Sequence, residues 1–70
     1  MIAATLSNDA VELYLDDVGV DHLISELQRM RGQTTHIHKM TPSWGGGELA
    51  ETVPHGELVH HLVICSNYSN

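Results

Sequence analysis

The stretch of sequence that decides the fold is residues 35–49, which reads Thr35-His36-Ile37-His38-Lys39-Met40-Thr41-Pro42-Ser43-Trp44-Gly45-Gly46-Gly47-Glu48-Leu49. Residues 34–40 are rich in β-branched side chains and predict a strand. Pro42 ends this strand, because proline has no N–H to donate to a ladder. The chain then reaches its only tryptophan, Trp44, which is followed by three consecutive glycines.

A second strand is predicted over residues 57–65, which include Leu58-Val59-His60-His61-Leu62-Val63-Ile64. This run is apolar on both faces, whereas a half-exposed strand normally alternates with polar residues. Four of the six histidines of the chain lie in these two strands. Functional residues are therefore expected in or between them.

The first half of the chain predicts a β-hairpin and a helix. Residues 2–7 alternate weakly and residues 10–16 alternate well, and the polar turn residues Ser7-Asn8-Asp9 join them. Apolar residues then recur every three or four positions, which predicts a helix over residues 19–31 with Gly19 or Asp17 as its N-cap. The members of this apolar stripe are Val20, Leu23, Ile24, Leu27 and Met30.

The predicted fold is α+β, a two-layer ββαββ domain with a four-stranded, mainly antiparallel sheet and one helix on one face. Residues 1–70 form a single domain, with a long loop at 42–56 and a frayed tail at 66–70. Because one helix covers only one face of a sheet, the other face should be covered by the loop, by a second copy or by another protein.

Composition excludes some classes of function. The formal net charge is −6, from nine acidic and three basic residues, which is unfavourable for nucleic-acid binding and favourable for a basic partner. No apolar run reaches the roughly 18 residues of a membrane span. The N-terminal residues lack a signal-peptide pattern, so we expect a cytoplasmic protein. The single cysteine, Cys65, is predicted to be a buried, inert thiol.

The histidines allow a metal site as an alternative. His36 and His38 lie two apart and share a face, and either His60 or His61 can join them from the neighbouring strand. We take His36, His38 and His60 as the candidate ligands of zinc or another transition metal. In the simpler interpretation they are partly buried sheet residues hydrogen-bonded to carbonyls, hydroxyls or Tyr14. A proton-transfer role needs a nucleophile, and the sequence identifies none.

Trp44 has two interpretations. It can fold back over the open face of the sheet as a lid, or it can stand exposed as an anchor in a protein interface. The glycines Gly45, Gly46 and Gly47 permit close backbone approach, but no helix-opening lysine follows them, so they do not form a phosphate loop. The acidic residues Glu48, Glu51 and Glu57 nearby favour a basic partner surface.

Residues 36–49, together with Gly56-Glu57-Leu58-Val59-His60-His61-Leu62, resemble the immunity protein 32 family of bacterial polymorphic toxin systems. The resemblance covers about residues 18–65, and its Trp-Gly-Gly-Gly core is its most specific part. It implies a small cytoplasmic protein that binds and blocks a cognate toxin without catalysis.

The leading hypothesis is therefore a non-enzymatic, immunity-type protein that binds a basic toxin. Its predicted partner-binding residues are Trp44, Gly45, Gly46, Gly47, Glu48 and Glu51. The alternatives are a small metal-binding protein with the histidine site, and a structural homodimer that packs its open sheet faces together.

Overall fold

The computed structural model describes residues 1–68 and confirms an α+β fold. Its elements are β1 (Ile2–Ser7), β2 (Ala10–Leu15), α1 (Asp17–Met30), β3 (Thr35–Met40), the 3₁₀ turn η1 (Pro42–Trp44), β4 (Glu57–Leu58) and β5 (His61–Ser66).

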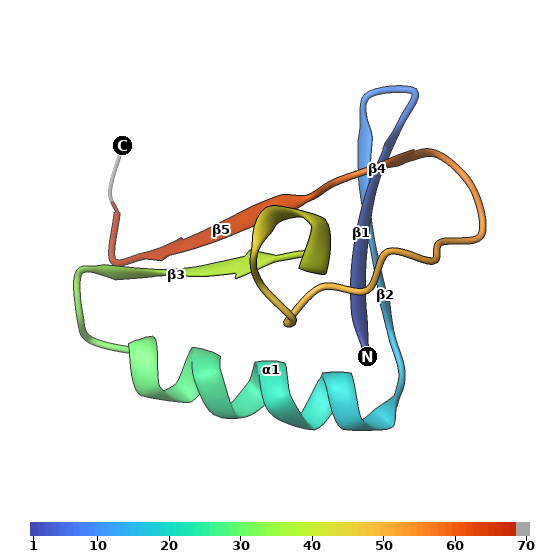
Figure 1. The fold of residues 1–70 in the computed structure, drawn as a ribbon. Coiled ribbons are helices and arrows are strands. Elements are labelled where there is room, and N and C mark those ends of the chain that lie inside the picture. The colour runs from blue at the N-terminus through green and yellow to red at the C-terminus, as the bar shows by residue number, and fades with distance from the viewer. Residues whose placement is uncertain (69–70) are drawn as a thin grey trace.

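The strands form two antiparallel sheets instead of the predicted single sheet of four strands. One sheet has the order β2-β1-β4, and the other pairs β3 with β5. Figure 1 shows the β1–β2 hairpin running steeply across the direction of β3 and β5, with α1 along the lower side of the molecule. The fold class matches the prediction. The helix, however, lies beside both sheets and does not cover the face of a single sheet.

The division into two sheets arises within the apolar run 57–65, which was predicted as one strand. The N–H of Val59 donates to the carbonyl of Ala4 in β1 at 2.9 Å. One residue later, the carbonyl of His60 accepts from the N–H of Thr41, at the end of β3, at 3.0 Å. The chain therefore leaves one sheet and joins the other between two adjacent residues, and this crossing interrupts the strand.

The predicted hairpin is confirmed. β1 and β2 pair along their full lengths, and Ser7 and Ala10 are the last pair before the turn. The two turn residues, Asn8 and Asp9, have φ values of 50° and 65°. Two successive residues in this left-handed region form the type of turn that matches the twist of a two-residue hairpin.

α1 begins at Asp17, two residues before the predicted start at residue 19, and ends at Met30. The N-cap is Asp16, whereas Gly19 or Asp17 was predicted. The Asp16 carboxylate accepts a hydrogen bond from the N–H of Gly19 at 2.8 Å. This bond satisfies one of the free N–H groups of the first turn and fixes the start of the helix.

Only part of the apolar stripe of α1 points into the interior. Val20, Ile24 and Leu27 are exposed, and the buried residues of the helix are Gly19 and Met30. The helix is thus rotated about its axis relative to the orientation that its periodicity predicts.

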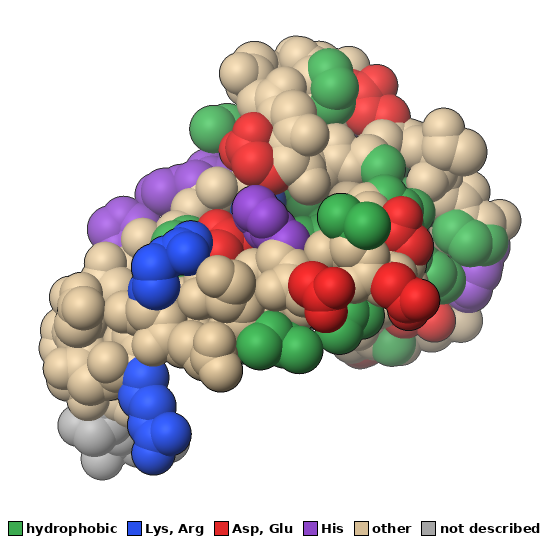
Figure 2. Space-filling view, turned by 90° about the horizontal axis from the view of Figure 1, so that it is seen from below, with side chains coloured by type: hydrophobic (Ala, Val, Ile, Leu, Met, Phe, Trp, Pro, Cys, Tyr) green, Lys and Arg blue, Asp and Glu red, His purple; other side chains and the backbone are tan. Residues whose placement is uncertain are grey.

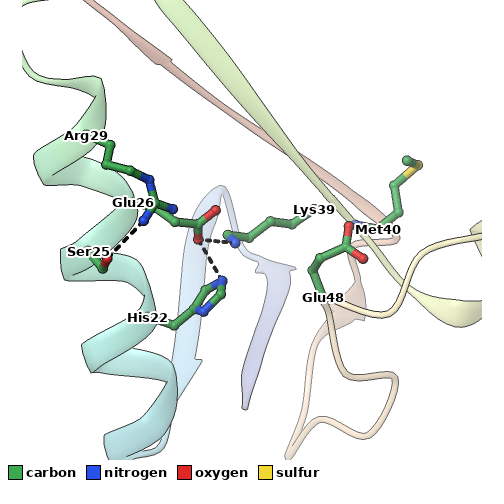
Figure 3. A network of polar contacts seen from close by, with 7 residues as sticks. All are labelled: His22, Ser25, Glu26, Arg29, Lys39, Met40 and Glu48. Carbon is green, nitrogen blue, oxygen red and sulfur yellow. Dashed lines mark hydrogen bonds and ion pairs between the residues drawn. The ribbon is translucent and has the colours of Figure 1, made fainter.

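A buried ion pair accounts for this rotation. Lys39 of β3 is only 1% exposed, and its ammonium group pairs with the carboxylate of Glu26 on α1 (Figure 3). The Nε2 atom of His22, one turn earlier, lies 3.2 Å from the same carboxylate. Burying a charge is costly unless it is paired. The pair therefore turns the polar side of α1 toward β3.

The hydrophobic interior is small. Its buried hydrophobic residues are Ile2, Ala3, Ala4, Met30 and Leu49. Leu49 comes from the long loop 42–56, and the next residue, Ala50, donates its N–H to the carbonyl of Ile2 at 2.8 Å. The loop therefore closes part of the interior, and its lid is Leu49 instead of Trp44.

A considerable apolar surface stays exposed around the hairpin and the helix. We define it as the hairpin–helix face, and its members are Leu6, Val11, Leu13, Leu15, Val20, Ile24 and Leu27. Figure 2, which views the molecule from the side of α1, shows hydrophobic side chains among acidic ones, with basic side chains toward one end.

Two predictions for the end of the chain need correction. Ser66 belongs to β5, and its Oγ donates to the carbonyl of Gln33 at 2.6 Å, so the predicted frayed tail 66–70 does not begin there. Residues 69–70 of that tail lie outside the described residues. Cys65 is exposed and not buried, because it shares the outward face of β5 with Val63.

The ion pair makes a stability prediction. Glu26→Ala should lower the free energy of unfolding by about 3 kcal/mol, because it leaves the Lys39 ammonium buried without its counter-charge. Urea denaturation at neutral pH measures this loss.

The matched control is Asp21→Ala, which removes an exposed acid from the same helix. The double variant Glu26→Leu/Lys39→Met should regain most of the lost stability, since it removes both buried charges. Equal losses for Glu26→Ala and Asp21→Ala would contradict the assigned role of the pair.

Candidate functional site

The register of β3 against β5 determines which histidines share a face. Met40 lies opposite His61, and residues two apart on a strand point to the same side. His36 and His38 therefore share their exposed face with His61. This answers the question that the sequence left open, and His60 is not the histidine on that face.

A continuous row of aromatic rings begins on this face and extends past it to the η1 turn, in the order His36, His38, His61, Trp44 and His60, and we call it the aromatic row. The ring centroids of His36 and His38 are 4.9 Å apart, and those of His38 and His61 are 5.0 Å apart. The Trp44 ring lies 6.2 Å from that of His61. It stacks on His60 at 5.7 Å with 8° between the ring planes.

The predicted metal ligands His36, His38 and His60 are not brought together. The Nδ1 atom of His60 lies 2.6 Å from the hydroxyl of Thr41, and its ring stacks on Trp44. The Nδ1 atom of His38 instead lies 2.7 Å from the Nε2 atom of His61, so these two rings share a hydrogen bond. Within residues 1–68, no three His, Cys, Asp or Glu side chains are arranged to hold a metal ion.

The contact between His60 and Thr41 resembles the pairing of a base with a hydroxyl nucleophile. Thr41, however, is fully buried, with 0% of its surface exposed. A substrate therefore cannot reach its hydroxyl. The pair acts as a structural link that holds the His60 ring beneath Trp44.

Backbone hydrogen bonds hold Trp44 in place on η1. The carbonyl of Thr41 accepts from the N–H of Trp44 at 2.9 Å and from that of Gly46 at 3.0 Å. Gly45 has a φ of 89°, in the region that glycine adopts without strain. A side chain on Gly46 would place its Cβ 2.5 Å from the carbonyl oxygen of Met40. The first two glycines are thus required by the tight turn that presents the indole.

Two carboxylates border this turn. The N–H of Ser43 donates to Glu51 at 2.6 Å, and the Ser43 side-chain and backbone hydrogen bonds hold the pKa of Glu51 below its ordinary value of 4.5. The proximity of His60 lowers this pKa further. The N–H of Gly47 donates to Glu48 at 2.6 Å and is the main cause of the lowered pKa of Glu48. Both carboxylates are therefore ionised at neutral pH.

The predicted partner-binding residues lie together at the surface. Trp44 is 58% exposed, and Gly45, Gly47, Glu48 and Glu51 are exposed around it. Trp44 is therefore exposed and does not fold over the sheet as a lid.

Two open pockets of ligand size lie away from the aromatic row. One open pocket of about 350 Å³ lies between the start of α1 and Glu48, and another of about 510 Å³ lies between Tyr14 and the loop at 52–54. Neither is lined by a residue of the row. Small-molecule sites are concave and enclose their ligands, so an open row of rings is better suited to a protein surface.

No protein-family model, curated protein or solved structure matches this chain. None of the helices in the described part of the chain has the length and apolar character needed to cross a membrane.

Two features of the site were not foreseen from the sequence. The stacking of Trp44 on His60 depends on the path of the loop 42–56, for which the sequence contains no periodic signal. The burial of Lys39, by contrast, is indicated by the sequence. Strand alternation places Lys39 opposite to the face of His36 and His38, and so toward the helix.

The glycines give a matched pair of variants. Gly46→Ala should lower the free energy of unfolding by about 1–3 kcal/mol, because the added Cβ meets the backbone of Met40. Gly47→Ala should change it by less than about 0.5 kcal/mol, because nothing lies within 4 Å of its added Cβ. Chemical denaturation of both variants checks this, and equal losses would show that the turn is not tightly packed.

The lowered pKa of Glu51 predicts a pH-dependent stability. A carboxyl group whose pKa is lower in the folded state stabilises the fold above its unfolded value of about 4.5, and this contribution is lost as the pH falls through the folded value. Glu51→Gln should therefore be less stable than the wild type at pH 7, and this difference should be smaller at pH 3. Thermal denaturation at both pH values measures the difference, and a constant difference would contradict the shift.

Proposed function

We propose that this chain is a non-enzymatic, immunity-type protein that binds and neutralises a cognate, basic bacterial toxin in the cytoplasm. The observation that carries the proposal is the exposed indole of Trp44, held on a hydrogen-bonded turn between two ionised carboxylates. A large rigid aromatic group that is exposed in the free protein matches the hot-spot residues of protein interfaces. Because the turn is already ordered, little conformational entropy is lost when it binds.

Charge supports the choice of a basic partner. The net charge of −6 steers a cationic protein toward this chain, and Glu48 and Glu51 place part of that charge beside the indole. Both carboxylates already accept backbone hydrogen bonds, so they are fixed in position before a partner arrives. An approaching Arg or Lys would thus meet preorganised acceptors next to an aromatic surface.

The resemblance of residues 36–49 and 56–62 to the immunity protein 32 family supports a toxin as the partner. The residues that carry this resemblance include the aromatic row and the turn that presents Trp44. An immunity role requires affinity and occlusion without turnover. This agrees with the site, because the Thr41 hydroxyl that contacts the His60 imidazole is buried and cannot be reached by a substrate.

The proposal predicts the effect of removing the indole. Trp44→Ala should weaken binding to the toxin domain encoded by the gene directly upstream by at least about 30-fold, the loss expected for an interface hot spot. Isothermal titration calorimetry gives the affinity, and growth during co-expression with the toxin reports protection.

The matched control is Val18→Ala, which truncates another exposed apolar side chain, on α1 and outside the aromatic row. It should bind and protect like the wild type. Circular dichroism establishes that both variants are folded. The proposal is wrong if no toxin gene lies upstream, if that toxin does not bind, or if folded Trp44→Ala binds as tightly as Val18→Ala.

A further inference from the structure

The outer edge of β2 is open for strand pairing. In the sheet order β2-β1-β4, β1 has neighbours on both sides and β2 has only β1. Ser7 and Ala10 close the hairpin turn, so Ala10 and every second residue after it direct their N–H and C=O groups toward β1. The bond from the N–H of Asp16 to the carbonyl of Met1 continues this alternation. The polar backbone groups of residues 11, 13 and 15 therefore point away from β1.

Nothing in residues 1–68 occupies this edge. No backbone hydrogen bond from outside the hairpin reaches Val11, Leu13 or Leu15 within the described chain. The side chains of the strand are also uncovered on one face, with Val11 65% and Leu13 43% exposed. Proteins protect free edges with lysine, proline, bulges or very short strands. β2 has six residues, so it is not a very short strand, and it contains neither lysine nor proline.

The two faces of β2 differ. Glu12 and Tyr14 lie on the face that the loop residue His55 covers, with the Tyr14 hydroxyl 2.9 Å from the Nε2 atom of His55. The same imidazole nitrogen lies 3.6 Å from the Glu12 carboxylate. A strand added beside β2 would thus meet a polar residue pattern on one face and an apolar pattern on the other.

We propose that a second copy of this chain occupies the edge, with β2 paired antiparallel to β2 of the partner copy about a two-fold axis at Leu13. Strand alternation requires a register centred on a residue, because a centre between two residues would place unlike faces together. Centres at residues 12, 13 and 14 are those that pair most of β2. Centring on Glu12 sets two carboxylates directly opposite each other. Centring on Tyr14 sets Glu12 opposite Asp16 of the other copy, again two acids. Like charges directly opposite each other are destabilising.

Centring on Leu13 avoids both conflicts. Leu13 then lies opposite its own copy, Val11 opposite Leu15, and Glu12 opposite the hydroxyl-bearing Tyr14. All of the outward N–H and C=O groups of residues 11, 13 and 15 exchange hydrogen bonds in this register. Two copies of β2 therefore match each other in residue pattern, charge and hydrogen bonding. A two-fold interface requires such self-complementarity.

The pairing joins the two three-stranded sheets into one sheet of six strands, β4-β1-β2-β2-β1-β4. Directly opposite residues lie on the same face, so the apolar faces of both hairpins become continuous. The interface uses no residue of the aromatic row. Dimer formation and toxin binding can therefore be tested independently.

Sedimentation equilibrium of the wild-type chain alone should give the mass of a dimer. Leu13→Arg should give a monomer, because it places two cations at the two-fold axis. The matched control is Val63→Arg on β5, since Val63 is 41% exposed and Leu13 43%; this variant should remain a dimer. A monomeric wild type, or equal masses for the two folded variants, overturns the proposal.

Disulfide trapping tests the register. In a Cys65→Ser background, Leu13→Cys alone should oxidise rapidly to a covalent dimer. Val11→Cys should form one only when mixed with Leu15→Cys. Self-trapping of Glu12→Cys or of Tyr14→Cys that exceeds that of Leu13→Cys would show one of the other registers and refute this one.

Discussion

The buried ion pair between Lys39 and Glu26 is the interaction on which the remaining structure depends. The interior is lined by small residues of β1, including Ala3 and Ala4, and it offers little volume for helix side chains. α1 therefore approaches β3 through its polar side, with the ammonium–carboxylate contact between them. Once this contact sets the rotation of the helix, Val20, Ile24 and Leu27 of its apolar stripe are directed to the surface. The helix part of the hairpin–helix face is a consequence of that geometry.

The set of side chains on the outer face of β3 and β5 follows from strand alternation, in which successive residues point to opposite faces. If Lys39 points inward, its neighbour His38 points outward together with His36, and both imidazoles face solvent. The crossing of the chain between Val59 and His60 then brings two more imidazoles beneath Trp44. A single periodicity therefore creates both the polar interior contact and the exposed row of rings.

Local signals were sufficient to predict some elements and insufficient for others. The hairpin, the helix and the end of β3 depend on nearby residues, such as the turn at Asn8-Asp9 and the break at Pro42, and the sequence predicted them. The division into two sheets depends on hydrogen bonds between residues far apart in the chain, which no local pattern encodes. For the same reason the sequence could not choose between His60 and His61. It also could not decide whether Trp44 folds over the sheet or stands exposed, because that depends on the path of the loop 42–56.

The central claim is that Trp44 is a preorganised, solvent-exposed anchor that a protein partner covers. Trp44 is the only tryptophan of the chain, so collisional quenching of its fluorescence by acrylamide reports its exposure directly if the toxin is first produced without tryptophan. The account predicts efficient quenching in the free protein and strong protection in the complex with the toxin. An indole that is already shielded in the free protein, or that is quenched equally with and without the toxin, would contradict it.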